Sequence, residues 1–348
     1  MFGHTPTRTF FNRVGCKLAP HNTWADVPKD TPIVGLKELP FPGPPLPHTH
    51  IQFAHCYKQQ AGWVDVLSRF KQGGGKLYDL EFLEDVNGRR VAAFGWHAGF
   101  AGAALGLLSL AEQAKNARLG PQKRYPNEKT LMEVVRTQVV ELKKFRKDGK
   151  VKAFVVGALG RCGRGTVDCL EKAGLSADDI TKWDMQETSA QSGPYQELLD
   201  VDLFVNCIYL DKKIPPFLTR ETISAAGADR RLGCIVDVSC DTTNPNNPLP
   251  VYDFNTTFES PTVDVDGLSS ESPVLTVISI DHLPTLLPRE ASEAFSNDLL
   301  PSLLQLPYVT GVQGSAIEAN PEEGKGAVWA QAEKLFREKL AEAEKEGA

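Results

Sequence analysis

Residues 152–165, which read KAFVVGALGRCGRG, decide the fold class. After Lys152 the stretch is apolar and includes two valines, and residues 152–157 are predicted to form a strand buried on both faces. A glycine-rich turn follows at once, and residues 166–173 have the spacing of a helix that ends at Gly174. A strand, a glycine-rich turn and a helix in this order are typical of a parallel α/β sheet.

The turn has the residue types of a phosphate-binding loop. Its candidate cofactor-binding residues are Gly157, Gly160, Arg161, Cys162 and Gly163. Glycines let backbone amides approach a pyrophosphate, and the helix N-terminus adds N–H donors. Asp184 ends the next predicted strand, at residues 180–185, where a carboxylate accepts hydrogen bonds from ribose hydroxyls and repels a 2′-phosphate. The pattern predicts an NAD site; the alternative is an ordinary strand–helix turn beside a surface aspartate.

Length and composition agree with a globular protein of about two domains. The chain has 348 residues, 41% of them hydrophobic and 24% charged. The net charge of −6 disfavours a nucleic-acid partner. Residues 94–110 are apolar and rich in small residues, and we expect a buried helix here rather than a membrane span.

Cysteine usage and the first residues of the chain indicate the compartment. The seven cysteines contain no CxxC pair, and the start of the chain lacks the apolar core of a signal peptide. We therefore expect a cytoplasmic protein with reduced thiols and no structural zinc. His48, His50 and His55 have no carboxylate or cysteine at a helical spacing to complete a metal site, so we predict no metal.

Further elements are predicted along the chain. Strands are expected at residues 31–36, 51–54, 76–82, 91–94, 201–210, 234–239 and 274–280, and helices at 57–70, 131–145, 289–304 and 327–346. We infer an α/β fold with two Rossmann-like, doubly wound parallel-sheet domains and an active-site cleft between them.

Titratable residues follow three of the early strands. Lys37 and Glu38 follow the strand predicted at residues 31–36, and His55 and Lys58 follow the strand predicted at residues 51–54. Asp79 and Glu81 belong to the strand predicted at residues 76–82. Each residue alone is best explained as a solvated loop residue. Together, a cation, an imidazole and two acids at the ends of neighbouring strands could handle the protons that accompany hydride transfer. This pattern suggests amine or alcohol oxidation without choosing between them.

Several longer motifs resemble one enzyme family along nearly the whole chain. They are 35–40 (GLKELP), 50–58 (HIQFAHCYK), 78–84 (YDLEFLE), 88–94 (GRRVAAF), 157–163 (GALGRCG), 241–245 (DTTNP) and 278–284 (ISIDHLP). The chain resembles fungal saccharopine dehydrogenase of the NAD-dependent, lysine-forming type. The wider superfamily includes alanine dehydrogenase and the soluble part of transhydrogenase.

The resemblance implies a reaction and residue roles. Saccharopine, NAD and water would give lysine, 2-oxoglutarate and NADH. Lys37 matches the base for the secondary amine, and His55 the group that activates water. Glu38 and Glu81 match acids that tune these two groups, and Lys58 and Arg90 match residues that bind substrate carboxylates. Asp184 matches the acid that binds the adenosine ribose, and Asp281 and His282 match residues near the nicotinamide. Alternatives are another amino-acid dehydrogenase of the superfamily and an impaired form that binds NAD only.

The resemblance also suggests the domain organisation. We expect residues 1–93 with 289–348 to form a substrate-side domain and residues 94–288 an NAD-binding domain with a linking helix. The family's first strand and helix, roughly 35 residues by the size of such a unit, have no counterpart, so we expect that domain to be incomplete and turnover impaired. Either a monomer or a weak dimer fits.

Two cysteines are placed at neighbouring strand ends by the expected topology. Cys162 lies in the phosphate loop, and Cys207 ends a strand expected beside that of residues 152–157. The two thiols could form a disulfide bond that blocks the pyrophosphate site. The alternative is two inert buried thiols.

Overall fold

The structure is a computed structural model that describes residues 15–37, 39–210, 212–240, 242, 246–269, 271–307 and 326–346. These residues form two compact α/β units. One unit comprises Phe94–Ser292, and the other comprises the described residues up to Ala93 together with those from Glu293 onward. Helix α8 (Pro288–Leu303) begins in the first unit and ends in the second.

The unit of Phe94–Ser292 is built on a six-stranded sheet in the order β5-β4-β6-β7-β9-β8. Only the β8–β9 pair is antiparallel. The strands are β4 (Ala153–Val156), β5 (Ile180–Trp183), β6 (Leu203–Asn206), β7 (Cys234–Asp237), β8 (Val263–Asp264) and β9 (Thr276–Ile278). Every residue of β4, β6 and β7 is buried, as the runs without strict alternation predict.

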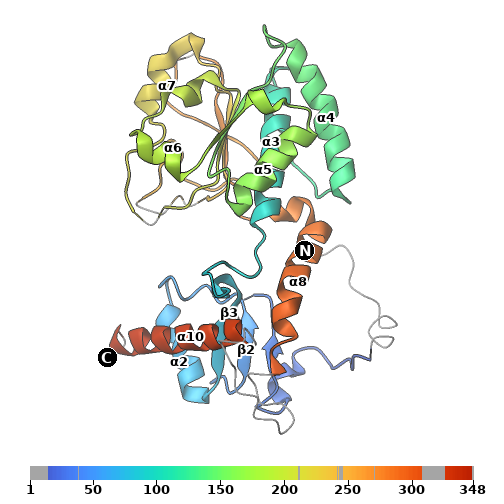
Figure 1. Cartoon of the computed structure of the whole chain (residues 1–348), viewed down its shortest axis with the longest axis vertical. Helices are drawn as coiled ribbons and strands as arrows, with labels where there is room; N and C mark the ends of the chain where they lie inside the picture. Colours follow the sequence, from blue (N-terminus) through green and yellow to red (C-terminus); the bar gives the residue numbers. More distant parts are fainter. Residues whose placement is uncertain are drawn as a thin grey trace. The chain divides into compact units, whose positions relative to one another are not determined.

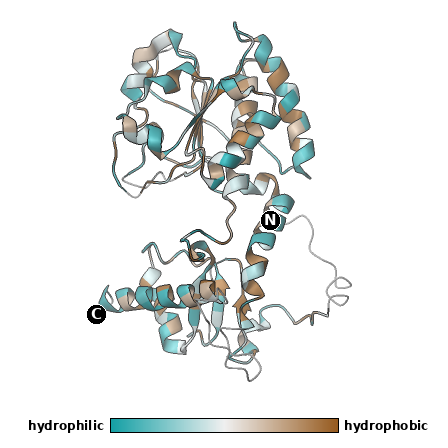
Figure 2. Ribbon diagram, viewed as in Figure 1, coloured by the Kyte–Doolittle hydropathy of each residue, from teal (hydrophilic) through white to brown (hydrophobic). Residues whose placement is uncertain are grey.

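Helices cover both faces of this sheet. In Figure 1, α3, α4 and α5 lie on one side of the strands and α6 and α7 on the other. The helices are α3 (Gly95–Gln113), α4 (Glu128–Lys144), α5 (Arg161–Lys172), α6 (Met185–Ala190) and α7 (Arg220–Ala226), with 3-10 turns η3 (Ala177–Asp179), η4 (Gln196–Asp200), η5 (Gly227–Asp229) and η6 (Leu283–Leu286). Figure 2 shows hydrophilic and hydrophobic residues alternating along the surface helix α4.

Small residues let α3 approach α5 closely. A Cβ on Gly99 would lie 1.9 Å from the carbonyl oxygen of Cys162, and a Cβ on Gly165 would lie 1.9 Å from that of Trp96. Most of α3 is buried, so the predicted buried helix is confirmed. Within the described residues, no helix is both long and apolar enough to cross a membrane.

The other unit has a parallel sheet in the order β1-β2-β3. Its elements are η1 (Thr23–Asp26), β1 (Ile33–Val34), β2 (Thr49–Gln52), α2 (Trp63–Gly73), β3 (Lys76–Asp79), η2 (Leu80–Phe82) and α10 (Ala327–Glu346). Phe336 of α10 packs against Phe70 of α2, with ring centroids 6.1 Å apart. Fully buried Trp329 contacts the ring of Tyr78 on β3. A helix from the far end of the sequence thus supplies part of this core.

Two local predictions are wrong. Residues 91–94 form no strand, because residues 84–90 fold back around Gly88 with a single bridge between Glu84 and Arg90, and α3 begins at Gly95. Helix α2 begins at Trp63 rather than at residue 57. Gly62 precedes it at φ +82°, a left-handed conformation that favours glycine and marks the break.

Candidate active site

The carboxyl ends of β1, β2 and β3 bring three predicted site segments to one edge of the smaller sheet. Lys37, His55 and Glu81 each follow one of these strands by two or three residues. The pairing continues beyond β1, since the N–H of Phe53 donates to the Leu36 carbonyl at 3.2 Å. Parallel neighbouring strands place their ends side by side, so the expected grouping is present. Glu38 lies outside the described residues.

Lys58 and Glu81 form an ion pair across this edge. Lys58 Nζ lies 2.8 Å from Glu81 Oε1, and the carboxylate side chain is 18% exposed. The turn that bears Lys58 is anchored by Tyr57, whose hydroxyl donates to the Leu77 carbonyl at 2.7 Å. The two predicted residues therefore contact each other directly.

Asp79, the last residue of β3, is a buried carboxylate behind His55 and Glu81. Its oxygens accept hydrogen bonds from the N–H of Glu81 at 2.9 Å and of Ala54 at 3.3 Å. Burial raises the pKa of Asp79 to about 6, and the Glu81 charge adds to that rise. His55 itself has φ +52°, a left-handed conformation uncommon outside glycine. Asp79 thus connects the backbone just before His55 to the backbone of Glu81.

Arg90 is exposed on the chain reversal around Gly88. His48 directly precedes β2 and His50 is part of it, and both are buried. The His50 ring packs edge-on against Trp24 and Phe70. Burial lowers the pKa of His50 to about 4, so both observations favour a packing role for His50.

The predicted phosphate loop has the geometry that a pyrophosphate needs. Gly157 adopts φ +81° directly after β4, and α5 begins at Arg161. A Cβ on Gly163 would lie 2.1 Å from the Gly157 carbonyl oxygen, so the loop closes only with glycine there. Gly160 and Arg161 are exposed residues at the helix N-terminus. These residues fit a dinucleotide phosphate.

Asp184 follows β5, as predicted, and is half-buried. It is also the N-cap of α6, where its side chain accepts from the N–H of Met185 at 2.8 Å and from the N–H of Leu159 at 2.9 Å. Asp184 therefore joins the phosphate loop to the second strand end. The spacing of Asp184 and Glu187 is a capping box, a signal in the sequence for the unpredicted helix α6.

The structure contradicts the disulfide bond suggested above, because Cys162 and Cys207 are not bonded to each other. Strands β4 and β6 are neighbours, so the topology behind the idea is correct. The Cys207 thiol instead lies 3.4 Å from the hydroxyl of Thr166 on α5. Burial raises the pKa of Cys207 well above its usual value, and the protonated thiol that results is unreactive in disulfide exchange.

Asp281 and His282 lie beyond the carboxyl end of β9 and are exposed. The His282 ring packs edge-on against Phe258, with ring centroids 5.4 Å apart. The side chains thus lie at the same edge of the larger sheet as the phosphate loop, since β4 and β9 point in the same direction.

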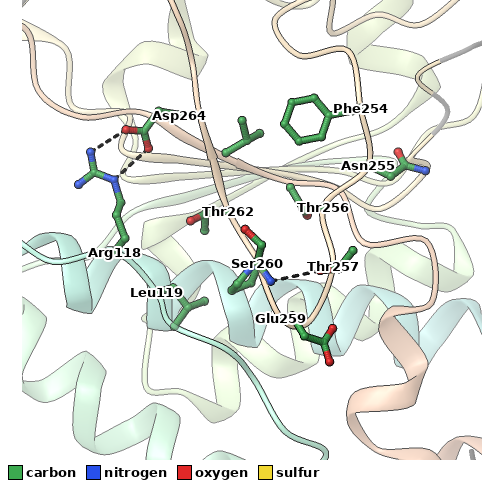
Figure 3. Close-up of a pocket in the computed structure, with 12 residues that line it drawn as sticks. Arg118, Leu119, Phe254, Asn255, Thr256, Thr257, Glu259, Ser260, Thr262 and Asp264 are labelled. Atoms are coloured by element: carbon green, nitrogen blue, oxygen red, sulfur yellow. Dashed lines mark hydrogen bonds and ion pairs between the residues drawn. The ribbon is translucent and has the colours of Figure 1, made fainter.

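A pocket of about 570 Å³ opens elsewhere in this unit (Figure 3). It is lined by the segment after α3 and by residues 254–264, and Arg118 forms a two-pronged ion pair with Asp264 at 2.9 and 2.8 Å. None of the predicted site residues lines this pocket. We therefore place the candidate site at the strand ends and not in this pocket.

The sequence matches known proteins along nearly its whole length. Residues 5–101 match the family model "Alanine dehydrogenase/PNT, N-terminal domain". A Neurospora crassa protein named saccharopine dehydrogenase [NAD(+), L-lysine-forming] is 51% identical over 97% of this chain and 87% of its own length. A Schizosaccharomyces pombe protein of the same name is 51% identical over 94% of this chain and 84% of its own length. The chain belongs to the lysine-forming saccharopine dehydrogenase family.

The fold of this family member is also that of a solved structure. An L-alanine dehydrogenase aligns with a TM-score of 0.58 over 95% of this chain and 87% of its own, at 14% identity. The predicted α/β fold class with parallel sheets is thereby confirmed.

The stability of the folded protein is expected to depend on pH through Asp79. The pKa of Asp79 is about 6 in the folded chain against 3.8 in the unfolded chain, so between these values only the folded chain keeps the proton. The contribution of Asp79 to the free energy of unfolding is therefore fully present below pH 3.8 and is lost as the pH rises through 6. The whole loss amounts to about 3 kcal/mol. Urea unfolding at pH 4.5 and 7.5 measures this, with Asp79→Asn as the reference that cannot titrate. If the difference between the two chains were the same at both pH values, the assignment would be wrong.

Proposed function

We propose that this protein catalyses the NAD-dependent oxidative cleavage of saccharopine to L-lysine and 2-oxoglutarate. The observation that supports this most is the identity of about 51% with saccharopine dehydrogenases along nearly the whole chain. The grouping of Lys37, His55 and Glu81 at one sheet edge agrees with it. The same identity disfavours another amino-acid dehydrogenase of the superfamily.

The reaction balances as saccharopine, NAD+ and water giving lysine, 2-oxoglutarate, NADH and a proton. NAD+, when bound, accepts the hydride that leaves the glutamyl Cα of the substrate. Lys37 takes the proton of the secondary amine, and an imine of the substrate results. His55 then activates the water that adds to the imine carbon, and afterwards returns a proton to the departing amine of lysine.

The remaining predicted residues bind the substrate or the cofactor, or adjust the protonation of Lys37 and His55. Glu38 and Glu81 adjust the protonation of the two catalytic groups, while Lys58 and Arg90 bind substrate carboxylates. Since Lys58 is paired with Glu81 at 2.8 Å, a substrate carboxylate would share this ammonium with Glu81. On the cofactor side we propose Gly157, Gly160, Arg161, Cys162, Gly163, Asp184, Cys207, Asp281 and His282.

Steady-state kinetics of the chain test this function. NADH formation is followed with saccharopine or with L-alanine as the substrate, at saturating NAD+. We expect turnover of saccharopine and none of alanine. NAD+ binding by calorimetry without turnover of saccharopine would favour the NAD-only alternative, and turnover of alanine would favour the other dehydrogenase.

Replacing Asp184 tests the ribose contact. Serine is also a good helix N-cap, so Asp184→Ser keeps the start of α6 while removing the carboxylate. We expect the KM for NAD+ to rise about tenfold, since one charge-assisted hydrogen bond contributes about 1.5 kcal/mol. Asp178→Ser, in the exposed turn before β5, is the matched control. An unchanged KM in Asp184→Ser would exclude the contact.

A further inference from the structure

Asp237, the last residue of β7, is a fully buried carboxylate at the carboxyl edge of the larger sheet. Its Oδ2 accepts the Tyr252 hydroxyl at 2.6 Å. Its Oδ1 accepts the Ser239 hydroxyl at 2.6 Å, the Ser239 N–H at 3.1 Å and the Asn206 amide at 3.0 Å. All four of these donors are neutral. A buried carboxylate surrounded by neutral donors orients each of them strongly, because each loses a charge-assisted hydrogen bond if it moves.

The Asn206 amide extends this cluster to the loop that follows β6. Asn206 is the last residue of β6 and is fully buried. Its Oδ1 accepts the N–H of Ile208 at 3.2 Å, and its Nδ2 donates to the Ile208 carbonyl at 3.3 Å. The side chain therefore fixes the backbone of the turn at residues 207–208, and Asp237 fixes the side chain.

That turn lies against the phosphate loop. A Cβ built on Gly157 would meet the Ile208 side chain at 2.9 Å and the Cys207 carbonyl oxygen at 3.0 Å. The chain of contacts thus runs from Asp237 through Asn206 and Ile208 to Gly157. A shift of the turn at residues 207–208 would therefore displace Gly157, which lies where the pyrophosphate is proposed to bind.

The order of the strands indicates which half of a dinucleotide this cluster faces. The chain runs from β4 to β5 on one side and then crosses to β6, β7 and β9 on the other. In such sheets the first half binds the adenosine and the second half the other nucleotide. Resting on the function proposed above, we propose that Asp237 is a positioning residue for the nicotinamide half of NAD, acting through Asn206, Ser239 and Tyr252 on the turns after β6 and β7.

Comparing the binding of two ligands distinguishes an effect on the nicotinamide half of NAD from an effect on the rest of the cofactor. The affinities of the full chain for NAD+ and for ADP-ribose, which lacks the nicotinamide ring, are measured by calorimetry for each variant. Asp237→Asn turns one acceptor oxygen into a donor, and Tyr252→Phe removes one donor while leaving the carboxylate. Asp202→Asn is the matched control, because Asp202 is equally buried in the same unit but precedes β6 at the opposite edge, paired with Arg146 and Arg231.

We expect the ratio of the Kd for NAD+ to the Kd for ADP-ribose to rise about tenfold in Asp237→Asn and about threefold in Tyr252→Phe, and to stay constant in Asp202→Asn. A general loss of stability, or a shift of the phosphate loop alone, would change both affinities together, because both ligands carry the pyrophosphate; only an effect on the nicotinamide half changes the ratio. If Asp237→Asn does not fold, Tyr252→Phe decides. An unchanged ratio in the folded variants overturns the inference, whereas failure of the unaltered chain to bind NAD+ or to cleave saccharopine counts against the proposed function.

Discussion

Gly163→Ala will weaken NAD+ binding more than any other single methyl group added to the phosphate loop. The new Cβ would lie 2.1 Å from the Gly157 carbonyl oxygen and 2.5 Å from the Ala158 Cα, both backbone atoms that can yield only if the loop opens. Overpacking of this kind costs about 1–3 kcal/mol, which corresponds to a Kd about fivefold to 150-fold higher. Calorimetry with NAD+ measures the Kd, and a thermal melt shows whether the chain is folded.

Gly120→Ala is the control for this prediction. No atom lies within 4 Å of a Cβ at Gly120, which is in the same unit. We expect its Kd for NAD+ and its Tm to equal those of the unaltered chain. A Gly163→Ala chain that bound NAD+ normally would show that the cofactor does not bind at this loop.

The second large effect is expected at the smaller sheet. His55→Gln will lower kcat for saccharopine about 100-fold or more, since general acid–base groups contribute about 10²- to 10⁴-fold. Lys37→Met should cause a loss of similar size. Both side chains are exposed, so neither replacement removes a packing contact of the core. The kcat and KM of each variant are measured under NAD+ saturation.

Two substitutions in the same unit serve as controls. His21 and Lys71 are also exposed, and both lie away from the carboxyl ends of β1–β3. His21→Gln and Lys71→Met should leave kcat unchanged. Near-normal turnover in both His55→Gln and Lys37→Met would remove these two residues from the mechanism.

The elements around the phosphate loop could be predicted because their signals are local. An apolar run, glycines at fixed spacing and a terminal acid predict β4, α5 and the position of Asp184 without reference to the rest of the chain. The grouping of Lys37, His55 and Glu81 needed only the rule that parallel strands share an edge. Element ends were less accurate, since β2 ends two residues before residue 54.

Other features depend on tertiary burial, which the sequence does not reveal. Asp79 and Asp237 look like ordinary strand-end acids, and only the structure shows that their carboxylates are buried and hydrogen-bonded. The disulfide prediction was wrong for a similar reason, because the pairing of two strands does not determine which atom a thiol at a strand end contacts. The strand predicted at residues 91–94 was wrong because no strand among the described residues pairs with this segment, and strand pairing is not a property of the segment alone.

The short strand β8 has a consequence for the behaviour of the protein at high concentration. Open sheets can recruit strands from other molecules through unpaired backbone groups at their edges. Here that edge of the larger sheet is a two-residue antiparallel strand, and its Asp264 is held by Arg118. So short and charged an edge offers a poor template for another chain, which protects this side of the protein against aggregation.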